Sequence, residues 1–471
     1  MRKRLGKLAA LFVLLLVVAA GVLWITVLSP IVHVGAAFQA KNYCSSLFIS
    51  GRAFEDIQKR DLTDPRLAYF TVEVDTDAKS VTGSLFGIAR HTAIFREGCG
   101  CTLLSETAED TLRAQPVPQR MPKQRDEAAP WPEGNAPIPG VVDTVKDKAR
   151  LQAALDVAFS EETAEPVRGT RAIVVVYDGR IVAERYLDGL SKDMPLSSYS
   201  MTKSIIGALV GIRVKEGKLN IHEPAPVPEW KDPADPRHAI TLDQLLRMSS
   251  GLEFDESYRD FTSDAIRMLH LLPDSGAFAA SKPLAHAPEE EWYYSSGTTN
   301  LISRAIRHSF DGDDQAYLNF PYQALLDPIG MNHSTLETDA SGTYVGSSYM
   351  YATVRDWARF GLLCLNDGVW NGERILPEGW IAYVRTATPK SPAEDQYGAH
   401  FWLNLGTPGN PEDRRWKSLP TETFACMGFE GQQVFMIPSR KTVVVRMGQT
   451  RRSGAWNYEQ FVGEVLASLP G

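Results

Sequence analysis

The hydrophobic and polar positions along the chain divide it into several parts. The first seven residues carry four basic side chains, and the stretch from Leu8 to Leu28 then contains no charge. As a helix, this stretch would be about 31 Å long, which is enough to cross the core of a bilayer. Because basic flanking residues stay on the cytoplasmic side, residues 1–34 predict an inner-membrane anchor, with the rest of the chain facing the periplasm. A cleaved signal peptide that releases the chain into the periplasm is the alternative.

Two further segments separate this start from the main body of the chain. Residues 35–114 form a small unit of unknown role, in which short apolar runs at residues 69–74 and 84–89 suggest strands. Residues 115–144 are rich in proline and in charge, a composition typical of an extended linker. The main folded region therefore begins near residue 145.

Residues 145–471 show helical and strand-like patterns at both ends. Asp178-Gly179 between two β-rich runs is a strong hairpin signal, and a second pair of runs lies near the C-terminus. The predicted helices and strands cover residues 145–160, 172–177, 180–186, 433–437, 442–447 and 456–469. This order predicts an α+β fold, with an antiparallel sheet built from both ends of the region and flanked by helices, and an all-helical middle subdomain.

Composition narrows the classes of function. The chain has 471 residues, 44% of them hydrophobic, which is enough apolar surface for a large core. Its net charge of -8 and the absence of a long Lys/Arg run argue against nucleic-acid binding. The nine histidines fall in no metal-ligand spacing, so we expect no metal and no other cofactor.

The five cysteines leave at least one thiol unpaired. An exported chain permits disulfides. Cys44 with either Cys99 or Cys101 is the plausible bridge, since all three lie in the small unit. Spacing alone does not choose between the two pairings.

The first motif with chemical meaning is Ser200-Met201-Thr202-Lys203, which opens an apolar run that reaches Ile212. Apolar positions cover most of this predicted helix, so we expect it to be buried. Residues three apart share a helix face, so Lys203 can reach the Ser200 hydroxyl. That hydroxyl is a poor nucleophile until a base takes its proton, and a desolvated lysine with a lowered pKa can do so. The alternative without catalysis is that Ser200 caps the N-terminus of the helix and that Lys203 is a solvated side chain.

A second polar cluster, Tyr293-Tyr294-Ser295-Ser296, precedes a helical pattern over residues 301–306. A phenol at this place can share a proton with Ser200 and Lys203 and then protonate the leaving group. An aromatic cluster that packs over the start of a helix is the alternative interpretation.

Together, Ser200-x-x-Lys203 and Tyr294-Ser295-Ser296 resemble the serine β-lactamase and penicillin-binding-protein superfamily. The resemblance is to its class C-like branch, which includes esterases and 6-aminohexanoate-dimer hydrolases. Three further family-like stretches follow in the family's order, at residues 240–252, 327–331 and 351–361. The resemblance covers about residues 145–471. It favours Tyr294 over Tyr293, because Tyr294 puts the small polar residues at the matching offsets.

The resemblance also implies a third motif on a strand beside the serine, where the family carries Lys-Thr-Gly or His-x-Gly. Residues 426–430, with the sequence CMGFE, occupy that place here. The backbone N–H groups of Ser200 and Phe429 would form the oxyanion hole. The side of the site that faces the substrate would be formed by Ser296, Cys426, Gly428 and Glu430.

Cys426 is a departure from the family pattern. It replaces the cation that pairs with a substrate carboxylate in penicillin recognition, which argues against β-lactamase and D-Ala-D-Ala peptidase activity. Glu430 is a candidate to attract a cationic substrate group instead.

These observations predict an exported or membrane-anchored serine hydrolase that cleaves small amides or esters through an acyl-enzyme on Ser200. The resemblance makes 6-aminohexanoate-oligomer-like amides one possibility. The alternatives are a non-catalytic envelope module that binds peptides with the same fold, and a β-lactamase or D-aminopeptidase. The chain lacks Gly-x-Ser-x-Gly, so we do not expect an α/β-hydrolase elbow.

Overall fold

The computed structural model describes residues 28–471 except 121, 123–125, 139, 162–166, 259, 394–395 and 408, together with scattered positions between 8 and 24. Much of the expected membrane anchor at residues 8–28 therefore lies outside the described residues. Within the described part of the chain, no helix has both the length and the apolar character that crossing a membrane requires.

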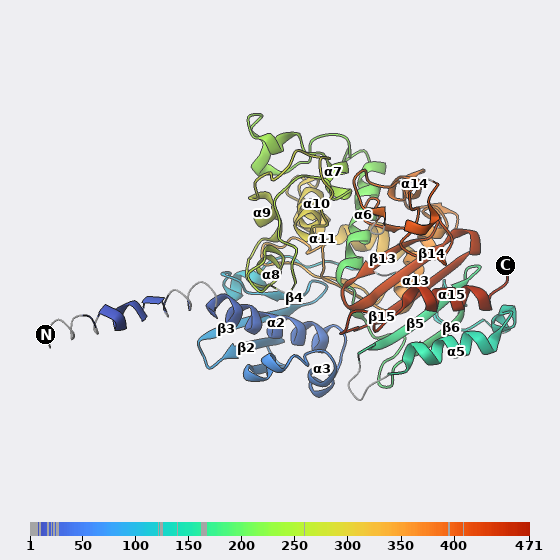
Figure 1. Cartoon of the computed structure of the whole chain (residues 1–471), viewed down its shortest axis with the longest axis horizontal. Helices are drawn as coiled ribbons and strands as arrows, with labels where there is room; N and C mark the ends of the chain where they lie inside the picture. The colour runs from blue at the N-terminus through green and yellow to red at the C-terminus, as the bar shows by residue number, and fades with distance from the viewer. Residues whose placement is uncertain are drawn as a thin grey trace.

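A six-stranded antiparallel sheet forms the centre of the main region (Figure 1). Its spatial order is β12-β13-β14-β15-β5-β6, so the first hairpin of the region pairs with the last strand of the chain. Val175 of β5 lies opposite Val444 of β15, which fixes the register of this junction. The six strands are β5 Thr170–Tyr177, β6 Arg180–Tyr186, β12 Trp402–Leu403, β13 Phe424–Gly428, β14 Gln432–Ile437 and β15 Thr442–Gly448. The predicted sheet from both ends of the region is confirmed.

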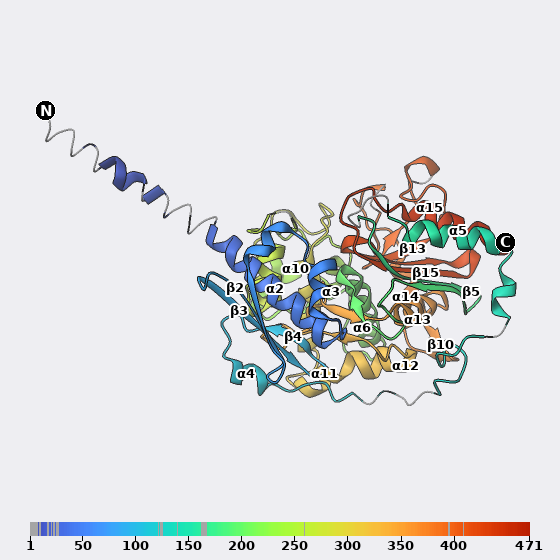
Figure 2. The same ribbon diagram turned by 90° about the horizontal axis from the view of Figure 1, so that it is seen from below.

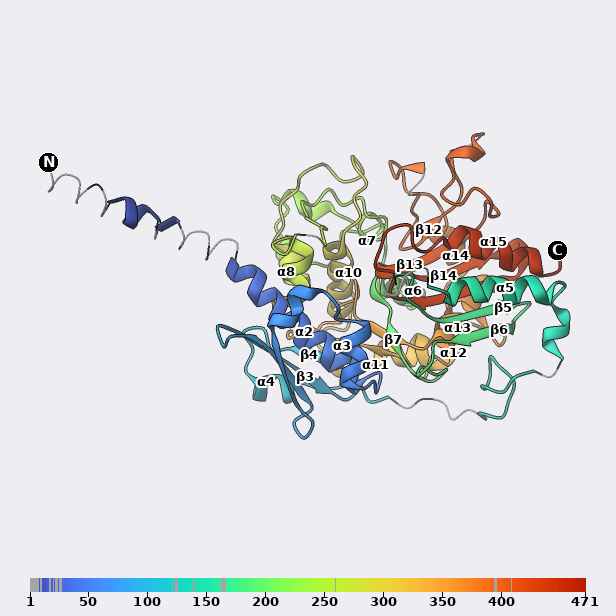
Figure 3. The same ribbon diagram turned by 60° about the horizontal axis from the view of Figure 1, so that its bottom comes forward.

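Helices cover both faces of this sheet. Side chains alternate between the faces along each strand, so Ile173 and Val175 pack with α5 and α15, whereas Val174 and Val176 belong to the core on the opposite face. Figure 3 shows α5 and α15 side by side over the sheet. On the opposite face, α13 packs against β5, β14 and β15. These helices are α5 Lys148–Phe159, α13 Val354–Leu365 and α15 Tyr458–Ser468.

The middle of the main region is mainly helical, as expected, but it also contains short strands. The helices are α6 Thr202–Lys215, α7 Leu242–Leu246, α8 Asp264–His270, α9 Ser275–Ala280, α10 Ser296–His308, α11 Asp314–Pro321, α12 Asp327–Ile329 and α14 Trp380–Val384. The short strands are β7 Leu196–Ser197, β8 Thr335–Leu336, β9 Met350–Ala352, β10 Val369–Trp370 and β11 Glu373–Arg374. Of these, β7, β9 and β8 form a three-stranded sheet directly before the Ser200 turn.

The N-terminal unit is a four-stranded meander with helix α2 packed against it. Cys44 on α2 and Cys101 on β4 form a disulfide, which settles the pairing that the sequence left open. The expected single strand at residues 84–89 is wrong: Ser84 and Leu85 end β2 and Ala89 begins β3, and residues 86–88 form the turn between them, where Phe86 and Gly87 both have positive φ. The elements are α2 Ser29–Phe48, α3 Phe54–Arg60, β1 Thr71–Asp75, β2 Ser80–Leu85, β3 Ala89–Arg96, β4 Gly100–Leu103 and α4 Glu109–Arg113.

Buried polar contacts attach the N-terminal unit to the main region. Glu337, which is 0% exposed, accepts hydrogen bonds from Lys41, from Ser45 and from the backbone N–H of Cys101. The Lys41 ammonium lies 2.5 Å from the carboxylate of Glu337. A buried ion pair of this kind loses much of its stabilisation to desolvation, but either partner left alone is costly. The two parts therefore depend on each other's side chains.

The described residues of the proline-rich linker lie on the outside of the main region (Figure 2). At its start, Arg120 forms an ion pair with Asp327 at 2.7 Å. Further along, Arg355 of α13 donates a hydrogen bond to the backbone carbonyl of Asn135 at 2.9 Å. The described residues of the linker include turns and a 3-10 segment, Val141–Thr144, and they are tied to the surface of the main region.

Candidate active site

Ser200 lies on a 3-10 turn, Tyr199–Met201, that connects β7 to the buried helix α6. Tyr199 has a φ of 47°, a conformation that is strained for a bulky residue and is common near functional sites. The turn is held by a 2.6 Å hydrogen bond from the Thr202 hydroxyl to the Tyr199 carbonyl. Residues 202–213 of α6 are buried, which agrees with the apolar pattern of the sequence. Ser200 is thus fixed at the start of a helix enclosed by the core.

The Lys203 ammonium lies 3.1 Å from the Ser200 hydroxyl oxygen. It also donates to the Ser296 hydroxyl at 3.1 Å and to the Ser347 carbonyl at 2.9 Å. The residue is only 1% exposed. Burial lowers the pKa of Lys203 to about 8, and the negative charge of Glu256 partly opposes this shift. A fraction of the lysine is therefore neutral near pH 7 and can take the proton of Ser200.

Tyr294 completes the group around the serine. Its ring centroid is 4.8 Å from the Lys203 ammonium, and Ser200 is near enough to its hydroxyl to lower the pKa of the phenol, against the larger effect of burial. Burial raises the pKa of this phenol, so it stays protonated at neutral pH and is suited to donate a proton. Tyr293 is 48% exposed, and its hydroxyl accepts a 3.3 Å hydrogen bond from the backbone N–H of Glu256. The structure thus places Tyr294 rather than Tyr293 beside the nucleophile.

Glu256 and Tyr258 belong to this network, although the sequence analysis did not single them out. The Glu256 carboxylate accepts hydrogen bonds from the Ser296 hydroxyl at 2.6 Å, the Ser296 backbone N–H at 2.7 Å and the Tyr258 hydroxyl at 2.9 Å. Burial raises the pKa of Glu256, while the charge of Lys203 opposes the rise. Both residues lie on a loop without hydrophobic periodicity, so the sequence offered no signal for them. Ser296 connects this carboxylate to Lys203.

The third motif lies on β13 and the turn after it. Gly428 has a structural reason to be glycine, because a Cβ there would be 2.5 Å from the Ser198 carbonyl, next to the serine turn. Phe429 is 51% exposed, and its ring contacts Tyr199 and Tyr258, with centroids 5.6 and 5.5 Å away. The motif therefore comes directly beside the turn that carries Ser200.

Cys426 lies in the core rather than at the cavity, and Glu430 already interacts with groups of the protein. Cys426 is 1% exposed and belongs to the hydrophobic core, and burial raises the pKa of its thiol to about 12. Glu430 accepts a 3.4 Å hydrogen bond from Tyr199, and the positive charges of Arg171 and Arg451 already act on its carboxylate. A cationic substrate group would thus compete with two guanidinium groups of the protein for Glu430.

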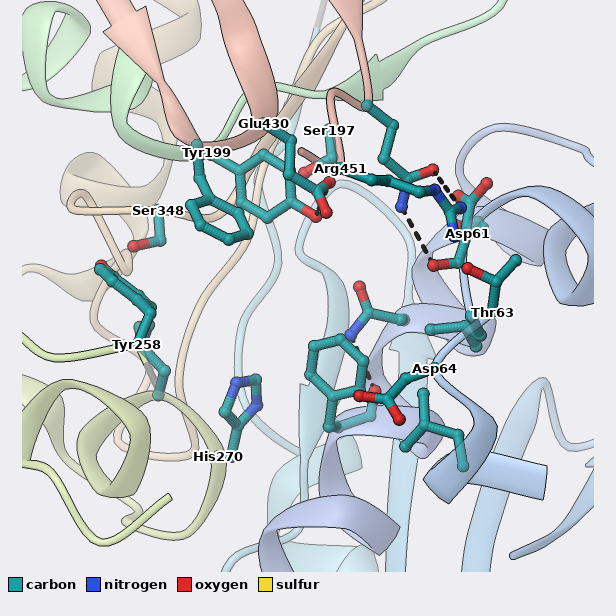
Figure 4. Close-up of a pocket in the computed structure, with 18 of the residues that line it drawn as sticks. Asp61, Thr63, Asp64, Ser197, Tyr199, Tyr258, His270, Ser348, Glu430 and Arg451 are labelled. Atoms are coloured by element: carbon teal, nitrogen blue, oxygen red, sulfur yellow. Dashed lines mark hydrogen bonds between the residues drawn. The ribbon is translucent and has the colours of Figure 1, made fainter. Parts of the chain in front are cut away.

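A cavity of 1210 Å³ opens at Ser200. Figure 4 shows Tyr199, Tyr258 and Glu430 on one side of it and Asp61, Thr63 and Asp64 of the N-terminal unit on the other. Of the four residues expected to face the substrate, Glu430 lines this cavity. Cys426 lies in the core, Gly428 lies against Ser198, and Ser296 is buried within the Lys203–Glu256 network.

Among the described residues, no cluster of histidine, cysteine, aspartate and glutamate has the arrangement of a metal site.

Comparison with known proteins identifies the family. The Beta-lactamase family model matches residues 155–459. The 6-aminohexanoate-dimer hydrolase of Paenarthrobacter ureafaciens is 22% identical over 302 residues, which cover 59% of this chain and 72% of that protein.

Solved structures show the same fold. One is a Bacillus anthracis protein described, without proof of activity, as a 6-aminohexanoate-dimer hydrolase. It has a TM-score of 0.54 at 22% identity, and the match covers 67% of this chain and 86% of that one. A class C β-lactamase in complex with cefoxitin has a TM-score of 0.51 at 15% identity, covering 68% and 99%. At these identities the likeness concerns the fold alone. From the family match, the chain belongs to the β-lactamase family of serine hydrolases and penicillin-binding proteins.

Proposed function

We propose that this protein is a serine hydrolase that cleaves ester or amide bonds through an acyl-enzyme on Ser200. The observation that carries the proposal is the convergence of two buried groups at one hydroxyl: the Lys203 ammonium lies 3.1 Å from it, and the phenol of Tyr294 lies beside both groups. The 6-aminohexanoate-dimer hydrolase relative supports amides among the substrates.

In the proposed reaction, neutral Lys203 takes the proton of Ser200 as the serine oxygen attacks the carbonyl carbon. The backbone N–H groups of Ser200 and Phe429 stabilise the negative charge that develops on the carbonyl oxygen. Tyr294 gives its proton to the leaving group and recovers one from Lys203. Water then attacks the acyl-enzyme, with Lys203 and Tyr294 moving its proton, and releases the acid.

The hydrolase proposal is tested by labelling with a fluorescent alkylphosphonate. We expect the wild type to be labelled on Ser200, and the Ser200→Ala variant not to be labelled. Ser204→Ala on the same helix is a matched control that keeps its label, because the Ser204 hydroxyl donates to the His400 carbonyl, away from the nucleophile. A folded wild type that does not react would favour the non-catalytic binding module.

The β-lactamase alternative is less well supported. Cys426 leaves no cation at the place where the family carries Lys or His, and its buried thiol does not provide one. We therefore expect little turnover of nitrocefin by an enzyme preparation that reacts fully with the phosphonate. Rapid nitrocefin hydrolysis that disappears in Ser200→Ala would favour the β-lactamase.

We further propose that the chain works outside the cytoplasm, anchored in the inner membrane by residues 8–28 or released into the periplasm. The Cys44–Cys101 disulfide supports an oxidising compartment. The test is thiol alkylation of the protein in intact cells without reductant: Cys44 and Cys101 should escape alkylation, whereas modification of both would oppose export.

A further inference from the structure

The N-terminal unit forms part of the wall of the cavity that contains Ser200. Ile31, Val34 and Phe38 of α2 line the cavity, and their spacing puts them on one face of that helix. Phe70 packs against the same helix at Gly35. A Cβ on Gly35 would be 2.4 Å from the ring of Phe70. A unit that the family match does not cover thus contributes directly to the site.

The main region supplies a second apolar wall. Phe261, Ile266 and Leu269 line the same cavity from the loop and helix that follow Tyr258. Arg66 of the N-terminal unit lies over the Phe261 ring, 5.1 Å from its centroid, and joins the two walls. Large hydrophobic side chains from both parts of the protein therefore face one space.

The charged groups at this cavity are mostly balanced by one another. Asp61 pairs with Arg52, 2.6 Å away, and with Arg171. Asp64 pairs with Arg66 at 2.5 Å. Burial and the charge of Lys41 lower the pKa of His270 to about 3, so this ring is neutral at physiological pH. A long apolar group can pass these side chains without facing an unbalanced charge.

The size of the cavity also argues against small substrates alone. Sites for drug-sized ligands usually occupy about 300–1,000 Å³. At 1210 Å³, this cavity exceeds that range, and it extends from the catalytic serine to α2. A short acyl group at Ser200 would leave most of the apolar wall in contact with water.

We propose that the substrates of this enzyme are esters or amides with a long, unbranched apolar chain, which lies between α2 and the segment 261–269 while the scissile carbonyl is at Ser200. The proposal rests on the serine-hydrolase function proposed above and specifies its substrate class. It gives the N-terminal unit a role in substrate selection.

The first experiment compares p-nitrophenyl acetate, butyrate and octanoate with the full-length protein, and alkyl acetates of matching length in a parallel series. Apolar burial predicts that kcat/KM rises by up to roughly four-fold per added methylene in the series whose chain enters the cavity. All of this activity should be absent from Ser200→Ala. A flat or falling profile in both series, with Ser200-dependent hydrolysis of the acetate intact, would overturn this inference and leave the hydrolase function standing.

The second experiment changes the cavity wall. Phe70→Glu puts a carboxylate on the path of the chain, and we expect the octanoate-to-acetate ratio of kcat/KM to fall at least about ten-fold. Phe86→Glu is the matched control, because Phe86 belongs to the same unit, is 78% exposed and is not part of the cavity wall. An equal ratio in both variants would contradict the proposal. If Phe70→Glu does not fold, Phe261→Glu replaces it, since Phe261 lines the opposite wall of the same cavity.

A binding measurement separates this inference from catalysis. A dansyl-labelled fatty acid should bind the Ser200→Ala variant, and Phe70→Glu in that background should weaken its binding about ten-fold. If no ester of any length is hydrolysed but the fatty acid binds in this way, the hydrolase function fails and the apolar-chain site stands. If the fatty acid does not bind, the site is refuted.

Discussion

Lys203 is buried, and desolvation brings the pKa of its ammonium to about 8, although the charge of Glu256 partly opposes the shift. The same residue donates hydrogen bonds to Ser200, Ser296 and the Ser347 carbonyl, so in the proposed reaction it would orient Ser200 as well as take its proton. Its role is thus tested by separating the loss of rate from the loss of stability.

Lys203→Ala should lower the rate of acylation by about three orders of magnitude or more, because the base is removed. The free energy of unfolding should fall by only about 1–3 kcal/mol, since the Ser347 carbonyl loses a donor but a buried charge is also removed. Stopped-flow acylation and chemical denaturation measure the two effects. Lys215→Ala at the exposed end of α6 is the control and should change neither. Loss of folding together with activity would mean that Lys203 is structural.

The pH profile follows from the same pKa. The neutral form of Lys203 is the active base, so kcat/KM should rise between about pH 7 and 9 and level off above that range. Steady-state hydrolysis of an uncharged ester measures this rise of kcat/KM, the basic limb of the pH profile. A rate that is constant across the range, or that falls, would contradict the assignment of Lys203 as base.

Glu256→Gln tests the coupling of the two buried groups. Because the Glu256 carboxylate raises the pKa of Lys203, its removal should move the basic limb of the pH profile to lower pH, by up to about one unit. Glu253→Gln, at an exposed position three residues earlier, should leave the limb in place. An unchanged limb in Glu256→Gln would show that the carboxylate has no electrostatic effect on the base.

At the scale of elements, the sequence predicted the parts whose signals are local. Asp178-Gly179 located the β5–β6 hairpin, and the apolar run after Ser200 predicted the buried helix α6. The prediction failed where an apolar run forms a turn: Phe86 follows Leu85 in a hydrophobic pattern, yet it has a φ of 48° and is 78% exposed. The sequence-based prediction also did not establish which face of β13 carries the Cys426 side chain, since that depends on the register with the neighbouring strands.

The disulfide joins two elements of the N-terminal unit that are 57 residues apart. Closing a loop of this length stabilises the fold by up to about 4 kcal/mol through the entropy of the unfolded chain. Cys44→Ser should therefore lower the free energy of unfolding by about 2–4 kcal/mol in denaturant titrations. Addition of a reductant should have the same effect on the wild type and none on the variant; equal stability of both proteins under oxidising conditions would refute this role.

At the scale of the whole molecule, the N-terminal unit and the main region share a buried ion pair and a cavity. Neither could be predicted from the sequence, because Lys41 and Glu337 lie 296 residues apart and no local pattern connects them. The spacing of Ser200 and Lys203 did predict that these two side chains meet, and the structure places them 3.1 Å apart. Loops such as the one with Glu256 and contacts between distant units become visible only in the folded chain.

Lys41→Met should destabilise the whole protein by about 3–5 kcal/mol, because Glu337 would remain as an unpaired buried charge. The double variant Lys41→Met/Glu337→Gln should recover part of this loss. Thermal unfolding of the full chain measures both, and a single variant as stable as the wild type would show that the two parts do not depend on this contact.

The central claim is that Ser200 becomes acylated with the help of Lys203 and Tyr294. Rapid-quench mass spectrometry of the wild type with p-nitrophenyl acetate tests it most directly. We predict a burst of p-nitrophenol equal to the enzyme concentration and an acetyl group on the peptide that contains Ser200, with neither in Lys203→Ala on the same time scale. Ester hydrolysis by the folded wild type without a covalent adduct, or with the adduct on another residue, would contradict the account.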